Sequence, residues 1–265
     1  MLNFAVIYSK KDEAGINIVE QLKEFFLPQV PIIEVKKDSI NCENIDEEYP
    51  ELKNTEFIIF ATKHQSKAGE KSLSLHAPGN WRNADFGGKM GKVCKTSSQA
   101  LKYLFQKLNE NAQTSGYKHN ITLECTHHGP LINKPCCFIE LGSSEEGWKD
   151  KEAAKIVAKT ISDFQNFKTN KNLKTAIAIG GPHYCPNFNK IQLNSKIYAI
   201  SHIIPEYALP LNENMLSEAI EKTLEHTNLA IIDWKGSGNS ENRQKIIDLL
   251  DKSSISHERT ERIEK

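Results

Sequence analysis

The chain has 265 residues, and its 34 basic and 34 acidic side chains give a formal net charge of zero. This balance excludes a histone-like polycation and an acidic disordered protein, while the length predicts one large α/β domain or two small ones. No apolar run approaches the ~20 residues of a membrane span, so we expect no membrane association. The apolar start lacks a basic signal segment and the six cysteines lack any disulfide or CxxC spacing, which predicts a cytoplasmic protein.

Short apolar runs alternate with longer amphipathic segments, a pattern typical of βαβ units and of a mostly parallel sheet flanked by helices. The predicted strands cover residues 4–8, 57–61, 121–125, 136–141, 175–179, 197–200 and 229–233. A helical spacing of Ile16, Val19, Leu22 and Phe26 follows the first strand, and further helices are predicted over 98–109, 151–164, 214–226 and 240–250. We expect one catalytic α/β unit over 1–252, undivided or made of two closely packed subdomains with a boundary near 95–115. The polar tail over 253–265 is expected to fray.

Residues 62–95 differ in composition from the rest of the chain. Seven bases stand against Glu70 and Asp85, a local net charge of +5, and five glycines accompany two histidines and Trp81. A stretch of this length without periodicity predicts a functional loop or a mobile linker. Its positive charge would suit phosphate groups that the zero net charge of the whole chain conceals.

Histidines gather at the ends of the predicted strands, where open parallel sheets bind their ligands. Six of the nine are placed in this way: His64, His76, His127, His128, His183 and His202. In an extended chain Glu124, Thr126 and His128 share one face, so a carboxylate lies two residues from an imidazole that it could orient or help to bind a metal. The alternative is that His127 and His128 only cap a strand.

Two further strand ends carry candidate groups. Gly180 and Gly181 allow close approach of a ligand to the backbone before His183, although an ordinary turn explains them as well. Glu140 in an apolar strand should be paired or functional, and Ser143 and Ser144 beyond it could hold an anion or simply cap a helix.

A histidine-rich metal site is one interpretation, but no His-Glu-x-x-His motif supports it. Histidine-assisted attack without a metal, with Thr126 or backbone N–H groups holding the oxyanion, is the other. Cys125, Cys136 and Cys137 are expected to be buried hydrophobic residues, and Cys185 is a weak candidate nucleophile.

Several motifs occur together in one order. They are His64-Gln65-Ser66, Leu75-His76-Ala77-Pro78-Gly79-Asn80-Trp81, Asp85-Phe86-Gly87-Gly88, Thr126-His127-His128-Gly129-Pro130, Glu140-Leu141-Gly142-Ser143-Ser144-Glu145-Glu146-Gly147-Trp148, Gly180-Gly181-Pro182-His183-Tyr184 and Ser201-His202-Ile203-Ile204-Pro205-Glu206-Tyr207-Ala208-Leu209. In order and spacing this set resembles the D-aminoacyl-tRNA deacylases of the archaeal and plant type, from residue 3 to about residue 250.

The resemblance implies an α/β fold related to phosphorylase/hydrolase-like and peptidyl-tRNA hydrolase-like sheets. It implies hydrolysis of the ester between a D-amino acid and the terminal ribose of tRNA, with two zinc ions per chain, the tRNA acceptor end as partner and no obligatory protein partner. A peptidyl-tRNA hydrolase-like esterase and a non-catalytic tRNA-end binding module are the alternatives.

We predict roles for three groups of residues. The catalytic candidates are His128, His183, Glu140 and Thr126, and the metal candidates are His76, His127 and Glu124. The substrate-binding candidates are Lys63, His64, Lys67, Asn80, Trp81, Arg82, Ser143, Ser144 and His202. Trp81 or Phe86 could stack on the terminal adenine, and an alternative role for either is that of a core aromatic that anchors the loop.

Overall fold

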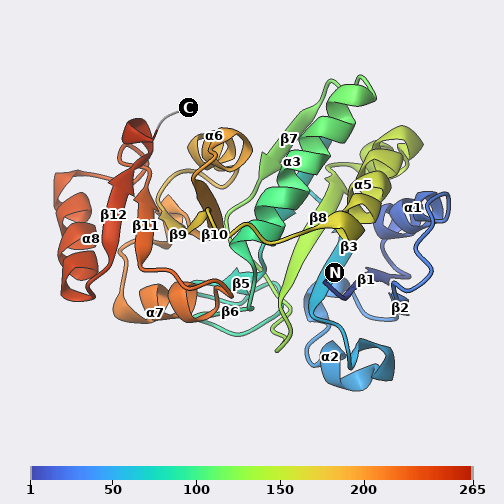
Figure 1. Ribbon diagram of the computed structural model, residues 1–265, viewed down its shortest axis with the longest axis horizontal. Helices are drawn as coiled ribbons and strands as arrows, with labels where there is room; N and C mark the ends of the chain where they lie inside the picture. Colours follow the sequence, from blue (N-terminus) through green and yellow to red (C-terminus); the bar gives the residue numbers. More distant parts are fainter. Residues whose placement is uncertain (1, 264–265) are drawn as a thin grey trace.

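The computed structural model of the protein describes residues 2–263. Two main sheets lie side by side, with helices around them (Figure 1). In spatial order the six-stranded sheet is β2 (Ile32–Val35), β1 (Phe4–Ser9), β3 (Phe57–Lys63), β8 (Cys136–Gly142), β4 (Ser72–His76) and β7 (Asn120–Leu123). The four-stranded sheet is β10 (Tyr198–Ile204), β9 (Lys174–Ile179), β11 (Leu229–Ile232) and β12 (Ser256–Arg259). A small ribbon pairs β5 (Gly79–Asn80) with β6 (Lys92–Val93).

Every pairing in the two main sheets is parallel except that of β4 with β8. The predicted class, a mostly parallel α/β fold flanked by helices, is therefore confirmed. Among the described residues no helix combines the length and apolarity needed to cross a membrane. The helices are α1 (Glu13–Leu22), α2 (Ile45–Glu48), α3 (Ser98–Thr114), α4 (Glu145–Trp148), α5 (Lys151–Asp163), α6 (Pro186–Asn194), α7 (Glu213–Glu221) and α8 (Ser240–Lys252).

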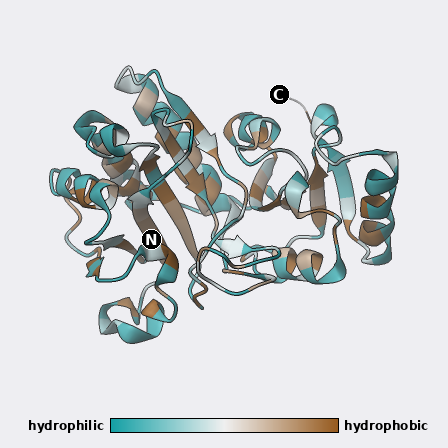
Figure 2. Cartoon of the chain, turned by 180° about the vertical axis from the view of Figure 1, so that it is seen from behind, coloured by the Kyte–Doolittle hydropathy of each residue, from teal (hydrophilic) through white to brown (hydrophobic). Residues whose placement is uncertain are grey.

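Alternation along the strands separates a core face from a site face in the large sheet. In β8, Cys137, Ile139 and Leu141 join the cluster formed with α1, α3 and α5, whereas Phe138 packs on the opposite side. Figure 2 shows these strands as mostly hydrophobic and the surrounding helices as largely hydrophilic outside. Glu140 shares the face of Phe138, so the sheet presents this carboxylate on the side that the three helices do not cover.

Several elements differ from the sequence prediction. The stretch over 62–95 is not one loop, since it begins with the end of β3 and contains β4, β5 and β6, and its irregular parts are 64–71, 77–78, 81–91 and 94–95. The sequence also failed to predict β2 and α6, and α7 ends at Glu221, five residues before the predicted end. The described part of the predicted tail, up to residue 263, includes β12, which pairs with β11, while 264–265 lie outside the described residues.

The two sheets are joined by α3. This helix contacts β4 and β7 of the large sheet as well as β9 and β10 of the small one. A boundary within 95–115 would cut this helix, whereas the chain passes from one sheet to the other between α5 and β9. The site described below lies near the junction of the sheets.

Candidate active site

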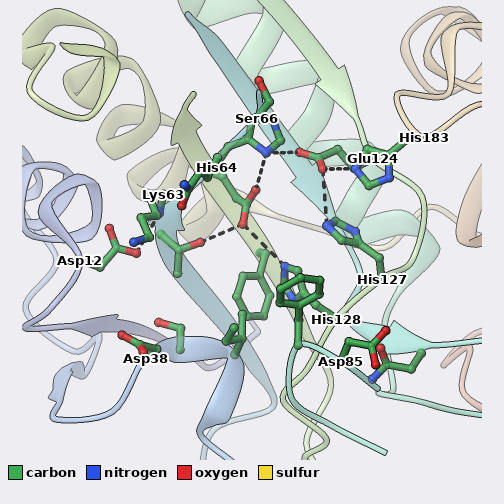
Figure 3. Close-up of a pocket in the computed structure, with 18 of the residues that line it drawn as sticks. Asp12, Asp38, Lys63, His64, Ser66, Asp85, Glu124, His127, His128 and His183 are labelled. Carbon is green, nitrogen blue, oxygen red and sulfur yellow. Dashed lines mark hydrogen bonds and ion pairs between the residues drawn. The ribbon is translucent and has the colours of Figure 1, made fainter. Parts of the chain in front are cut away.

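A cavity of about 1000 Å³ opens where β3 and β7 end and where the turn after β9 meets them. Figure 3 shows His64, Glu124, His127, His128 and His183 directed toward one another in this cavity. They come from segments far apart in the chain, as expected for groups at the carboxyl ends of parallel strands.

Glu140 is held by hydroxyl groups of the two neighbouring strands. It lies beside Thr62 of β3 and Ser74 of β4 in the sheet register. Thr62 Oγ1 donates to one carboxylate oxygen at 3.1 Å, and Ser74 Oγ donates to the other at 3.2 Å. Glu140 is only 3% exposed. A buried carboxylate is costly unless it is hydrogen-bonded or paired with positive charge, and here it has hydroxyl donors and imidazoles around it.

The segment that follows β7 carries groups from the large sheet toward the small one. The backbone N–H of Glu124 donates to Leu75, that of Cys125 to His183, and that of Thr126 to Ile203 of β10. Next, His128 adopts a left-handed backbone conformation with φ of 46°, which is uncommon for a residue other than glycine. The path of this segment from the large sheet to the small one places Glu124, His127 and His128 over the polar face of β4 and β8.

His76, His127 and His128 share one hydrogen-bond arrangement. Each directs Nδ1 to a backbone carbonyl oxygen, at 3.2, 2.9 and 2.6 Å respectively. A carbonyl oxygen only accepts, so Nδ1 must carry the proton and, in a neutral ring, Nε2 has a free lone pair. Burial lowers the pKa of His127 well below its usual range and that of His128 to about 4, and the nearby His76 lowers both further. His127 and His128 are therefore neutral at pH 7.

The three Nε2 atoms face the two buried carboxylates. His76 Nε2 lies 3.6 Å from a carboxylate oxygen of Glu140, and His128 Nε2 lies 4.0 Å from the same carboxylate. His127 Nε2 lies 3.6 Å from Glu124. His76 Nε2 is buried without a hydrogen-bond partner. A lone pair opposite a carboxylate is unfavourable unless a proton or a metal cation lies between them. With ligand atoms within 4.8 Å of one another, the three imidazoles fit a zinc ion, for which imidazole and carboxylate are ordinary ligands.

His64 and His183 lie on the other side of Glu124. His64 Nδ1 is 3.1 Å from Glu124 and 3.4 Å from Glu140, while His183 Nε2 is 2.7 Å from Glu124. Burial opposes protonation of both rings, yet the carboxylates raise the pKa of His64 to about 11. Hydrogen bonding to Cys125 and Glu124 raises that of His183 to about 10. Burial would raise the pKa of Glu124, but these imidazoles hold it well below its ordinary value. The carboxylates thus stay ionised beside two protonated imidazoles.

The predicted substrate-binding residues divide into two groups. Lys63, His64, Lys67 and Asn80 line the cavity. The indole N–H of Trp81 instead donates to Ile203, in a buried position, and the guanidinium of Arg82 donates to two backbone carbonyls after β10. Trp81 thus matches the alternative of a core aromatic that anchors the loop.

The remaining predicted site residues lie away from the cavity. The hydroxyl of Thr126, predicted to be catalytic, is buried against His202 Nδ1 and accepts from the backbone of Ile203. His202 lies inside β10 and is fully buried. Ser143 bonds Ser66 and the backbone of Glu70, and Ser144 only precedes α4. None of these four predicted residues lines the cavity.

Sequence reasoning assigned no role to Asp12, Tyr184 or Tyr207, which also line the cavity. The hydroxyl of Tyr184 is 3.2 Å from His64 Nε2, and that of Tyr207 is 3.1 Å from Cys125 Sγ. Tyr184 lies in the motif over 180–184 and Tyr207 in the motif over 201–209, and this position is the sequence signal that could have identified them as site residues. Asp12, seen beside Lys63 in Figure 3, caps α1 and accepts from the backbone of Lys63; no local pattern indicates that long-range contact.

Comparison with known proteins connects this geometry to a family. Residues 51–258 match the family model described as D-aminoacyl-tRNA deacylase. The curated D-aminoacyl-tRNA deacylase of Thermococcus kodakarensis is 36% identical to this chain, over 88% of this chain and 91% of that protein. The curated D-aminoacyl-tRNA deacylase of Methanocaldococcus jannaschii is 32% identical, over 97% of this chain and 100% of that protein. A crystal structure of a conserved protein of unknown function aligns with a TM-score of 0.89 at 30% identity, covering 99% of this chain and 96% of that one. The chain belongs to the D-aminoacyl-tRNA deacylase family.

Proposed function

We propose that this protein hydrolyses the ester that joins a D-amino acid to the 3′ end of tRNA, and that His76, His127 and His128 hold a zinc ion through Nε2. The observation that carries the proposal is the convergence of three Nε2 atoms on two buried carboxylates, each from a ring whose Nδ1 bonds a backbone carbonyl oxygen. The contacts of the three Nδ1 atoms with backbone carbonyl oxygens support it, since a metal-binding histidine ordinarily donates its other N–H to a carbonyl or carboxylate.

Ester hydrolysis needs an activated water molecule and stabilisation of the developing oxyanion. Bound zinc would supply a water molecule with a pKa near 7 and polarise the ester carbonyl. Glu124 and Glu140 supply the negative charge that a divalent cation requires. His183, protonated and 32% exposed through its side chain, stands at the cavity wall, where its charge stabilises an anionic oxygen of the reacting ester.

The acceptor end of the tRNA would enter across the rim of the cavity. Lys63 and Lys67 are exposed residues of the cavity lining, and they offer two ammonium groups to the phosphates that precede the terminal ribose. Because Arg82 is committed to backbone carbonyls, the proposed electrostatic contact rests on these two lysines.

The decisive experiment combines metal analysis with three substrates. We expect the purified protein to contain zinc, to cleave D-tyrosyl-tRNA, and to lose activity on chelation and regain it when zinc is added. L-tyrosyl-tRNA and N-acetyl-L-tyrosyl-tRNA serve as controls for chirality and for peptidyl-tRNA hydrolase-like activity. Full turnover after zinc has been removed would contradict the metal assignment, and equal turnover of the D- and L-esters would contradict the substrate. Metal content per chain also decides between one ion and two.

A further inference from the structure

The cavity has a second end, away from the ionised cluster, that the proposed chemistry does not use. Figure 3 shows Asp38 and Asp85 on the side of the cavity away from His64 and Glu124. Phe86 lines the cavity next to Asp85 and is 69% exposed. Ile40, on the segment that carries Asp38, also lines the cavity.

The backbone around Phe86 is fixed although its ring is exposed. The carbonyl oxygen of Phe86 accepts from Gly129 at 2.8 Å, and Asn80 Nδ2 donates to the next carbonyl at 2.8 Å. Gly87 and Gly88 have φ of 73° and 77°, in the left-handed region that favours glycine, and a Cβ at Gly87 would clash with the carbonyl oxygen of Ile40. An anchored loop thus presents an aromatic ring to the cavity without burying it.

Aromatic exposure is concentrated at this cavity. Four aromatic side chains are among the exposed large hydrophobic residues in the described chain, and three of them, Phe86, Tyr184 and Tyr207, line it. The hydroxyls of the two tyrosines are engaged with the histidine and cysteine groups, whereas Phe86 has no polar atom to place. A ring that neither packs in a core nor hydrogen-bonds is suited to stacking on a planar ligand.

The charge of the neighbouring residues indicates which planar group would fit. Asp38 and Asp85 are exposed carboxylates that would repel a phosphate but accept hydrogen bonds from an exocyclic amino group, as acidic side chains do from cytosine N4. Single-stranded nucleic acid ends are bound by stacking bases on aromatic side chains. We infer that Phe86, with Ile40, Asp38 and Asp85, forms a subsite for an amino-bearing nucleobase, the terminal adenine of the substrate. This inference rests on the proposed function.

The test compares esters that differ only in the base. Phe86→Ala should lower kcat/KM for D-tyrosyl-tRNA and for 3′-O-D-tyrosyl-adenosine by about 5- to 150-fold, mainly through KM, because stacking contributes about 1–3 kcal/mol per base. It should leave hydrolysis of D-tyrosyl-ribose, which has no base, unchanged. Phe86→Trp should retain wild-type turnover of the adenosine ester. Phe26→Ala removes a phenylalanine that is 82% exposed outside the cavity and is the matched control.

Each result has a defined meaning. An equal loss on the adenosine and ribose esters would assign Phe86 to the architecture of the loop and overturn the subsite, as would an unchanged kcat/KM for the adenosine ester. Equal wild-type turnover of the adenosine ester and the purine riboside ester, which lacks the amino group, would overturn the role of the carboxylates. If the wild-type protein cleaves no D-aminoacyl ester, the proposed function itself fails, a result that is distinct from these.

Discussion

Glu124 Oε2 lies 2.7 Å from Nε2 of His183, joining the end of β7 to the turn after β9 across 59 residues of chain. The same carboxylate contacts His64 and His127, so one buried charge is shared by three imidazoles. Removing it should therefore alter several groups together, which distinguishes it from an ordinary structural ion pair.

Glu124→Gln preserves the shape of this side chain and removes its charge. We expect the pKa of His183 to fall from about 10 toward its usual range, because the loss of a nearby carboxylate disfavours the protonated ring. Turnover should fall by about 10²-fold or more, and zinc affinity by about 10–100-fold, the usual cost of losing a partner of a metal ligand. Histidine titration by NMR, zinc binding and kinetics measure the three effects. A variant that keeps its zinc affinity and its rate would return Glu124 to a structural role.

His76→Ala and His128→Ala test the assignment of the metal ligands. Each should lose the stoichiometric zinc of the wild-type protein and reduce turnover by at least about 10²-fold, whereas loss of a strand cap would cost only about 1 kcal/mol of stability and leave the rate nearly intact. His202→Ala is the control, because His202 is buried like His76 but belongs to none of the groups of side chains in the described part of the chain that could hold a metal ion. It should lower the melting temperature and retain zinc. Wild-type zinc content in either site variant would exclude that histidine as a ligand.

The sequence predicted the buried strands and the grouping of histidines at strand ends better than it predicted the walls of the site. Runs such as that of β3 are apolar on both faces, which indicates burial directly. By contrast, β4 alternates serine with leucine. On its polar face Ser74 donates to Glu140, which is 66 residues away in the chain. The strand β12 is polar because it lies at a sheet edge. Tryptophan and arginine are common in ligand sites, but Trp81 and Arg82 donate to backbone carbonyls more than 120 residues away in the chain. No local sequence pattern reveals these contacts.

Lys63→Ala combined with Lys67→Ala should weaken tRNA binding and flatten its dependence on salt. Each phosphate contact with a single strand contributes about 0.7 to the slope of log K against log salt, so the loss of both contacts should reduce the slope by about 1.4. Arg82→Ala should leave the slope unchanged but lower stability by about 1 kcal/mol, since two backbone carbonyls, one of them exposed to water, lose their donor. Filter binding over a salt series gives the slopes. A reduced slope in the Arg82 variant would instead place its guanidinium on the RNA.

Lys102 of α3 should make stability depend on alkaline pH. It is 5% exposed, donates to the backbone carbonyl of Gln192 at 2.7 Å, and burial lowers its pKa from 10.5 to about 8. Between these two pKa values the unfolded chain binds more protons than the folded one, so the free energy of unfolding rises with pH. The folded protein bears the full cost of burying the charged amine below pH 8, and this cost declines as the pH rises toward 10.5. Lys102→Met removes the amine and with it the cost of burying its charge. The variant also leaves the Gln192 carbonyl without its donor, and that loss is the same at every pH. Relative to wild type, the free energy of unfolding of this variant should therefore fall by about 2 kcal/mol between about pH 7 and about pH 10. Urea denaturation of both proteins at the two pH values measures the difference, in which the titration of all other groups cancels. A difference that does not change with pH would mean that the amine is hydrated and titrates normally in the folded protein.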